Sequence, residues 1–420
     1  MKKLLLASLG CALPFGGLAQ GAPTPDRLNR AGVEAAPARV SPGETEVNIL
    51  GSYYQQDGNR SAVEGGIGTQ QLTDISPTIV LNVPLDSLTR VSANIGFDYY
   101  ASASTDRIDQ VLSSPSAHDV RIHADLGYSR TLRDRHTIVG LGAGASKEYD
   151  YQSFNVVGSW AKSSRDGNRE LSVAGQAFFD QVTLILPVEL RTGGNQRNGS
   201  GFDSRQSFNL SVVYSQVLSK RLQVAVSAEL VAQRGLLSTP FQRVYFYDYS
   251  PLGLTAGQLG TAKAEVLPRL RNKYPVALRL NYYATDLVQL RAFYRFYNDN
   301  FGIQAHTLEL EAPLKLMPFF TLYPFYRYHT QTASTYFAPY LTHSVANEYF
   351  TSDYDLAAFS AQKTGLGLRY APLYGLGRFK TPFHGRVAKF KSLDLRYGYY
   401  WQTTGLTANI VSVDFSFVMP

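Results

Sequence analysis

Apolar and polar residues alternate along much of this chain, and this period of two limits its fold more than any other feature. The clearest stretch runs from Arg90 to Tyr100, where every second residue from Val91 onward is apolar or aromatic and most of the others are small or polar. Successive side chains of an extended strand point to opposite faces. One face of this strand therefore suits an apolar environment, and the other suits water.

Sixteen segments with this character are predicted to be strands, most of them long enough to cross a bilayer when tilted, which takes about 9 to 11 residues. They lie near residues 46–54, 73–83, 89–102, 119–131, 136–148, 152–163, 169–182, 206–218, 221–233, 274–284, 287–298, 301–313, 319–331, 357–370, 391–402 and 406–418.

The connections between these segments alternate in length, as bacterial membrane barrels require when both termini lie in the periplasm. Compact turn sequences are found at Pro84–Ser87, Arg133–Arg135, Arg165–Asn168, Ser219–Lys220, Thr285–Asp286 and Leu316–Pro318. Nearly all the long connections fall on the other side, at Gln55–Gln71, Ser102–His118, Leu184–Ser204, Gly235–Lys273 and Thr332–Leu356. The main exception is Leu373–Lys389, a basic connection on the periplasmic side, which is interpreted as an elongated turn or a contact for a periplasmic partner.

These patterns predict an all-β fold, a transmembrane antiparallel up-and-down β-barrel of about 16 strands over residues 46–420. A sheet with one face in lipid cannot leave edge amides and carbonyls unpaired, so the last strand must pair with the first. A soluble β-sandwich shares the alternation but usually has shorter strands and no systematic loop asymmetry. No segment after the N-terminus has the 18 or more consecutive apolar residues of a spanning helix.

The first residues have the features of a secretory signal peptide, assigned to residues 1–19. Lys2 and Lys3 precede an apolar run, and small residues precede a cleavage point after Ala19. A lipoprotein signal ending at Cys11 is the alternative. Residues 20–45 form a Pro- and Ala-rich lead-in, predicted to be flexible and periplasmic. Cys11 is the only cysteine, so cleavage after Ala19 excludes disulfides and cysteine-ligated metals from the mature chain.

The composition agrees with a membrane barrel. Charged residues make up 17% of the chain and aromatic residues 13%, whereas about 25% of an ordinary globular sequence is charged. The net charge of +7 is spread over strands and turns rather than gathered in one arm or helix, which argues against nucleic acid as a partner. Two girdles of aromatic residues are expected from Tyr53, Tyr54, Tyr99, Tyr100, Tyr282, Tyr283, Tyr399, Tyr400 and Trp401, some of which could equally pack in the lumen.

The polar face of the second half is expected to line the lumen and to pair opposite charges across neighbouring strands. Its charged residues are Arg279, Arg291, Arg295, Glu309, Glu311, Arg327, Arg369, Asp394, Arg396 and Asp414. They are interpreted either as a charged constriction that selects anions or zwitterionic solutes, or as pairs that brace the wall or hold an inserted loop. The connection Gly235–Lys273, with Phe241, Tyr245, Phe246, Tyr247 and Tyr249, is expected to fold inward as a plug or constriction, or to form an ordered external loop.

No catalytic site and no cofactor are predicted. His306 and His329 fall on adjacent predicted strands, and His123 lies near Arg121 and Asp125, but no spacing selects a nucleophile. The seven histidines are scattered, without the close spacing of a metal site.

The first third has the most distinctive residues, namely Asp57–Arg60, Gly65–Thr69, Asp74–Pro77 and Asp98–Asp106. These segments resemble an uncharacterised, domain-of-unknown-function family of bacterial outer-membrane proteins, common among the Bacteroidota, over most of the mature chain. The resemblance implies a barrel and no assigned activity. Asp98, Ser102, Asp106 and Asp109 offer oxygen ligands for a hard cation such as calcium, although solvated loop carboxylates are the alternative reading.

The sequence thus predicts a pore or transport channel in the bacterial outer membrane, surrounded by outer-membrane lipid. The alternative is a non-conducting barrel that serves as a scaffold or binds a partner, supported by the bulky lumen residues Tyr283, Phe293, Tyr297, Tyr323 and Phe325. The last strand, with Val411, Val413, Phe415 and Phe417 on one face, resembles the C-terminal signal read by the outer-membrane insertion machinery, although Met419 and Pro420 follow it. The sequence does not indicate an oligomeric state.

Overall fold

Antiparallel strands, taken in chain order, form one closed wall in the computed structural model, which describes residues 43–103, 118–187, 190, 201–248, 262–380 and 387–419. The wall is a 16-strand barrel, so the predicted strand count is confirmed. Its strands are β1 (Thr45–Asp57), β2 (Gln71–Pro84), β3 (Thr89–Ala103), β4 (His118–Thr131), β5 (Thr137–Lys147), β6 (Tyr151–Ser163), β7 (Arg169–Thr183), β8 (Phe202–Val217), β9 (Leu222–Gly235), β12 (Leu270–Lys273) with β13 (Val276–Tyr283), β14 (Gln289–Asn298), β15 (Gln304–Glu311) with β16 (Leu314–Met317), β17 (Phe320–Gln331), β18 (Phe359–Tyr370), β20 (Val387–Gln402) and β21 (Thr407–Met419). The predicted signal peptide and nearly all of the lead-in lie outside the described residues.

The first and last strands close the barrel. Every residue of β1, from Thr45 to Asp57, has an antiparallel partner on β21, from Met419 to Thr407. On its other side β1 pairs with β2. The backbone polar groups along this seam are therefore satisfied by neighbouring strands, as the interior of a bilayer demands.

Prolines account for the two strands that are split in two. Pro275 separates β12 from β13, and its carbonyl accepts a hydrogen bond from the Glu229 amide. Pro313 separates β15 from β16, opposite the part of β17 that contains Pro324. Because proline has no amide hydrogen, a regular ladder cannot continue through these points.

The alternation of the sequence maps onto the two faces of the wall. On β3, Ile95, Phe97 and Tyr99 point outward and are 53%, 48% and 40% exposed, whereas Asp98 points inward and is 3% exposed. The outer face is therefore apolar and the inner face is polar, as predicted.

The expected aromatic girdles are correct for only part of the set. Tyr53, Tyr99, Tyr282 and Tyr399 lie on the outer face, and Trp401 stacks on Tyr399 at 5.8 Å. In contrast, Tyr54 is buried, with Tyr100 and Tyr400 packed against it. Neighbouring tyrosines in a strand must face opposite sides, so each Tyr-Tyr pair contributes one ring to the lumen.

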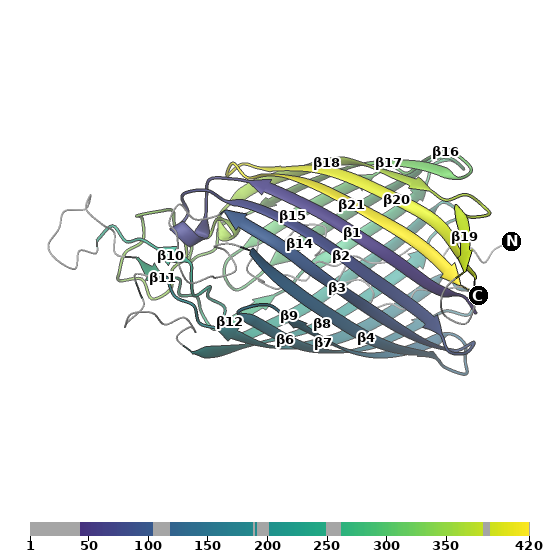
Figure 1. The fold of residues 1–420 in the computed structure, drawn as a ribbon, viewed down its shortest axis with the longest axis horizontal. Coiled ribbons are helices and arrows are strands. Elements are labelled where there is room, and N and C mark those ends of the chain that lie inside the picture. The colour runs from purple at the N-terminus through teal and green to yellow at the C-terminus, as the bar shows by residue number, and fades with distance from the viewer. Residues whose placement is uncertain are drawn as a thin grey trace.

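The two ends of the barrel differ (Figure 1). The turn end has short connections and the start of β1 and end of β21, while the loop end has the long connections. The loops of the loop end include a short sheet of β10 (Arg243–Val244) and β11 (Lys263–Ala264) and two single helical turns, η1 (Ala62–Glu64) and η3 (Tyr354–Leu356). Among the described residues, no helix is both long and apolar enough to cross a membrane.

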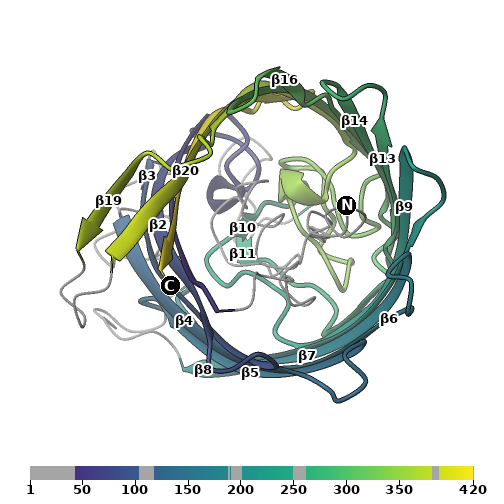
Figure 2. The ribbon, with the colours of Figure 1, turned by 90° about the vertical axis from the view of Figure 1, so that its right-hand side faces the viewer.

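The exceptional connection at the turn end is a β-hairpin. β19 (Gly377–Lys380) pairs with the first residues of β20 and extends the sheet beyond the barrel rim, and Figure 2 shows it outside the ring of strands. Leu373 and Tyr374 before it are 81% and 78% exposed. Residues 381–386 of this connection lie outside the described part of the chain.

Candidate functional site

The charged residues expected in the lumen lie on the inner faces of the strands in the second half of the wall. Arg279 is on β13, Arg291 and Arg295 are on β14, and Glu309 and Glu311 are on β15. Glu309 lies opposite Arg327 of β17 in the strand ladder. Arg369 of β18 lies opposite Asp394 of β20, with 3.9 Å between a guanidinium nitrogen and a carboxylate oxygen. Arg279 and Arg295 stack on the rings of Phe293 and Tyr297.

Glu311 joins two arginines from different parts of the wall. Its carboxylate accepts a hydrogen bond from Arg291 on the neighbouring strand at 2.7 Å and one from Arg396 of β20 at 2.9 Å. β20 is three strands away from β15, with β17 and β18 between them. The sequence predicted ladders between neighbouring strands, whereas this contact also spans a wider arc of the lumen.

Glycines on the inner wall make room for this contact. A Cβ atom on Gly367 would lie 1.8 Å from the Tyr323 ring, and one on Gly365 would lie 2.4 Å from the Phe325 ring. These rings therefore occupy the space that side chains at Gly365 and Gly367 of β18 would need. The Arg396 guanidinium stacks on Phe325 with 4.0 Å to the ring centre, which directs it toward Glu311.

The arginine side chains of the lumen are more exposed near the turn end than near the loop end. Near the turn end the side chains of Arg291 and Arg369 are 42% and 52% exposed. Near the loop end Arg271 is 6% exposed, although it also lies on the inner face. The lumen is therefore accessible to solvent from the turn end and covered at the loop end.

The cover is a group of packed loops, here called the loop cap, made of residues 58–70, 236–248, 262–269, 299–303 and 332–358. In Figure 1 β10 and β11 lie beyond the strand ends, and in Figure 2 they project within the ring of strands. The cap has its own apolar core, in which Leu237, Leu267, Phe301, Ile303 and Leu356 are buried together.

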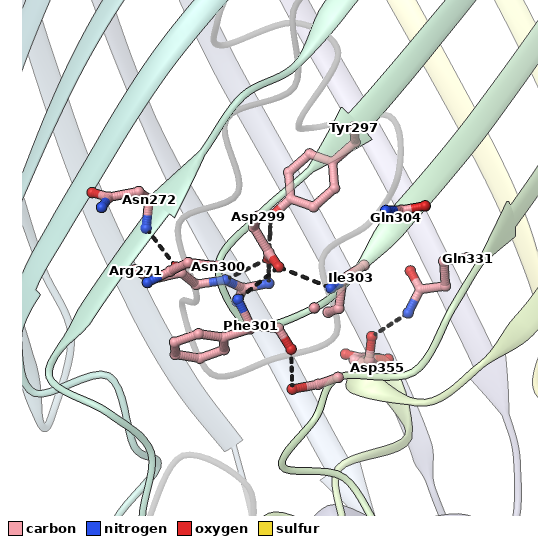
Figure 3. Close-up of polar contacts among 12 residues, drawn as sticks. Arg271, Asn272, Tyr297, Asp299, Asn300, Phe301, Ile303, Gln304, Gln331 and Asp355 are labelled. Atoms are coloured by element: carbon pink, nitrogen blue, oxygen red, sulfur yellow. Dashed lines mark hydrogen bonds and ion pairs between the residues drawn. The ribbon is translucent and has the colours of Figure 1, made fainter.

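A buried ion pair fixes the cap to the wall (Figure 3). Arg271 of β12 donates to Asp299 through Nη2 at 2.6 Å and through Nε at 2.9 Å. The Tyr297 hydroxyl donates to the same carboxylate oxygen, Oδ2 of Asp299, at 2.7 Å. The other carboxylate oxygen, Oδ1, accepts hydrogen bonds from the backbone amides of Phe301 and Ile303. Asp299 thus ties the wall to the turn that begins the cap.

Further contacts hold the remaining loops of the cap. Gln331 at the end of β17 donates to the carbonyls of Asp355 and Ala357 at 2.9 and 2.8 Å. Arg243 of β10 lies 3.6 Å from Glu64 of η1 and donates to the Val63 carbonyl. These contacts join loops that are far apart in the sequence.

Three carboxyl groups lie close together in the cap: Glu265 is buried, Asp353 is half-buried and Asp355 is exposed. Glu265 accepts the Thr239 amide at 2.7 Å, and burial together with the nearby Asp353 raises the pKa of Glu265 to about 8. Desolvation within the cap also raises the pKa of the half-buried Asp353. Gln242 donates to Asp353 at 3.3 Å.

The predicted inward loop, Gly235–Lys273, forms part of the cap instead of a plug deep in the barrel. Phe241, Tyr245 and Phe246 are buried, with Phe246 packed edge-on against Phe350 of the 332–358 loop. Tyr247 is 59% exposed, and Tyr249 lies outside the described residues. The loop is ordered by contacts with another loop, and this partnership leaves no periodic signal in the sequence.

A group of acidic side chains lies at the loop end of the opposite wall. Oxygen atoms of Asp119, Glu148 and Asp150 come within 4.8 Å of one another, which is a spacing that could hold a metal ion. Tyr100 donates to Asp119 and to Glu148, and Arg121 lies 3.8 Å from Glu148. Burial raises the pKa of Glu148 to about 7.

The cation site expected from the sequence overlaps only the edge of this group. Asp98 is buried at 3.5 Å from Arg121, which also contacts Glu148. Asp106, Asp109 and the side chain of Ser102 lie outside the described part of the chain. The sequence did not indicate Asp119, Glu148 or Asp150, because their proximity results from the pairing of separate strands.

Comparisons with known proteins identify the family of this chain. The family model described as "Protein of unknown function (DUF3570)" matches residues 5–381. No curated protein matches the chain.

Solved structures with a related shape are distant. A bacterial polysaccharide outer membrane secretin matches with a TM-score of 0.45 at 12% identity, covering 89% of this chain and 97% of the other. A ferric enterobactin receptor mutant from Pseudomonas aeruginosa matches with a TM-score of 0.42 at 14% identity, covering 86% of this chain and 54% of the receptor. CdiB from Acinetobacter baumannii matches with a TM-score of 0.43 at 12% identity, covering 88% of this chain and 60% of CdiB. This chain spans about half the length of that receptor, and at these scores no property of these proteins is transferred to it.

Proposed function

We propose that this chain, which belongs to the DUF3570 family of unknown function, forms a gated pathway for small polar or charged solutes across the bacterial outer membrane. One observation carries the proposal: the lumen is lined by exposed charges at the turn end and covered by packed loops at the loop end. Arg369 is 52% exposed and Arg271 only 6% exposed within the same lumen. Opening the cap would make the pathway continuous.

The charges at the open end suggest which solutes enter. Arg291 and Arg369 are the more exposed members of their ion pairs, while their acidic partners Glu311 and Asp394 are 11% and 27% exposed. The face presented to water is therefore predominantly cationic. We propose that anionic or zwitterionic solutes enter more readily than cations.

The first test is planar-bilayer conductance of the refolded barrel with and without an intact cap. Asp299→Ala removes one partner of the buried Arg271 pair, a change that typically costs about 3–5 kcal/mol, so the cap should open and the conductance should rise several-fold above that of the unmodified barrel. Gln331→Ala is a milder variant that removes two cap contacts. Asp166→Ala is the control, because Asp166 stabilises a turn at the other end.

Selectivity gives a second readout of the same proposal. In the Asp299→Ala background, Arg291→Gln with Arg369→Gln should reduce the preference for anions, measured as a shift of the reversal potential in a salt gradient. If the Asp299→Ala and Gln331→Ala barrels are folded, heat-modifiable and as silent as the unmodified protein, the open pathway is wrong.

The alternative proposal is a non-conducting scaffold that binds a partner. The Arg396, Phe325 and Tyr323 stack favours it, because these rings thicken the inner wall. The exposed Leu373 and Tyr374 at the turn end offer a periplasmic partner an apolar contact. Silence in all the variants, together with copurification that Leu373→Ser and Tyr374→Ser abolish, would support this role. Neither proposal includes a catalytic step, and both assume assembly by the outer-membrane insertion machinery.

A further inference from the structure

A groove crosses the outer face of the wall where two lipid-facing glycines are paired. Gly158 of β6 and Gly175 of β7 are direct partners in the ladder. The outward residues at the same level on the neighbouring strands are Leu141 of β5 and Leu210 of β8. Two adjacent strands therefore have no side chain at a level where the strands on either side have leucine.

The groove has a volume of about 710 Å³, and its lining is mostly apolar. Toward the loop end the groove continues over the small side chains of Ala177 and Ala232, which lie on either side of Phe208 in the strand ladder. Leu230 and Tyr274 form a further part of the lining and are 55% and 45% exposed. The groove thus continues from the middle of the wall toward the loop end.

The backbone does not require these glycines. A Cβ atom added at Gly158 would lie 3.8 Å from Leu141 Cδ2, and one added at Gly175 would lie 4.0 Å from the Asn209 carbonyl oxygen. Both are ordinary van der Waals contacts. Both residues have the extended backbone of a strand, within β6 and β7. A larger apolar residue would fit at either position, so the groove can be filled without disturbing the fold.

Two cations lie near the loop end of this face. Arg234 points outward from β9, opposite Leu270 and Gln206 and two residues from Ala232 on the groove floor, or about 7 Å along the strand. Lys147 points outward at the end of β5. Both side chains are exposed, and no ion pair involves either of them among the residues that the structure describes.

We propose that this groove binds an acyl chain of a membrane lipid whose anionic, phosphate-bearing headgroup contacts Arg234, with Lys147 available to the same headgroup layer. The groove faces the hydrocarbon layer, and the cations stand at the end where headgroups begin, so the apolar and charged parts match the two parts of such a lipid. Dense packing of the chain against the groove provides dispersion contacts that an empty groove would lose.

A second copy of the chain fits the groove less well. Two copies with the same orientation in a membrane are related by an axis along its normal. A contact centred on this groove would therefore bring the Arg234 side chains of both copies to the same height and close to each other. Repulsion between like charges disfavours that arrangement, whereas an anionic headgroup removes it.

Native mass spectrometry of the protein released from nanodiscs of phosphatidylglycerol or phosphatidylcholine tests the proposal. The unmodified barrel should retain phosphatidylglycerol, and the double variant Gly158→Leu with Gly175→Leu should retain about tenfold less, since the filled groove excludes several methylene groups. Arg234→Gln should remove the preference for phosphatidylglycerol over phosphatidylcholine while some retention persists. Ala292→Leu, an apolar addition on the outer face of β14, is the matched control and should behave like the unmodified protein.

Two results would overturn the proposal. Equal lipid retention by the unmodified barrel and by a folded, heat-modifiable double-leucine variant would exclude the groove as the binding site. A change of oligomeric state in that variant, with lipid retention unchanged, would assign the groove to contact between copies. Neither result depends on whether the barrel conducts.

Discussion

At the scale of single residues, Gly367 illustrates how the inner wall sets the shape of the lumen. Its missing side chain is required by the Tyr323 ring, which would lie 1.8 Å from a Cβ atom. We expect Gly367→Ala to push the ring into the lumen and to destabilise the barrel by about 1–3 kcal/mol, as overpacking does elsewhere. The midpoint of urea unfolding in detergent, followed by heat modifiability, measures this loss.

The ring itself provides the control for this prediction. Tyr323→Ser removes the clash, so the double variant Gly367→Ala with Tyr323→Ser should lose less stability than the two single variants added together. Gly158→Ala, where an added Cβ meets only Leu141 at 3.8 Å, should be almost neutral. An equal effect of alanine at Gly158 and Gly367 would mean that glycine matters here only through backbone entropy.

Residue-level prediction from sequence was accurate for the face of the wall and inaccurate for contacts. The period of two placed Glu311 and Arg396 on the inner face correctly, because a one-residue shift would reverse every side chain of a strand. It did not predict that they meet, because Arg396 reaches Glu311 past two intervening strands. Asp299 was missed as well, since only the folded loop shows that it accepts from Arg271 and two amides.

At the scale of elements, the loop cap should respond to pH. The pKa of Glu265 is higher in the folded cap, at about 8, than its ordinary value of 4.5. The folded state therefore binds the proton more tightly, so this stabilisation is fully present below about pH 4.5 and is lost as the pH rises to about 8. We expect the cap to loosen between these values, and the conductance of the barrel to be higher at pH 9 than at pH 5.

The groups around Glu265 define the control. It faces the Thr239 amide, the Thr351 hydroxyl and Asp353, and Asp353 in turn faces Gln242 and Asp355. Glu265→Gln keeps the size and an acceptor for Thr239 but cannot ionise, so most of the pH response should disappear. Protease cleavage within 332–358, compared between pH 5 and pH 9, provides a readout that does not require conduction. Equal cleavage of the unmodified cap at both values would contradict the prediction.

The wall strands could be predicted from the sequence, whereas the contacts between the cap loops could not. The wall strands have two environments, lipid and lumen, and each strand therefore has a sequence pattern that shows its extent within a few residues. The segments 236–248 and 332–358 contact each other through single pairs such as Phe246 and Phe350, which have no period. The long, aromatic-rich sequence of Gly235–Lys273 indicated a structured loop, but its partner, the segment 332–358, became evident only in the fold.

At the scale of the whole molecule, closure of the wall should be the step on which every other feature depends. All residues of β1 pair with β21, so loss of residues 407–419 would leave one open edge on β1 and another on β20. In a bilayer each exposed backbone group costs several kcal/mol, because no water replaces the missing partner. We expect a chain that ends at residue 406 to aggregate and to show no heat-modifiable band after refolding in detergent.

Deletion of residues 20–42, which precede the first wall strand, is the control and should leave the heat-modifiable band intact. A truncated chain that still folded into a heat-modifiable monomer would mean that β1 and β20 can pair directly, giving a smaller barrel with a narrower lumen.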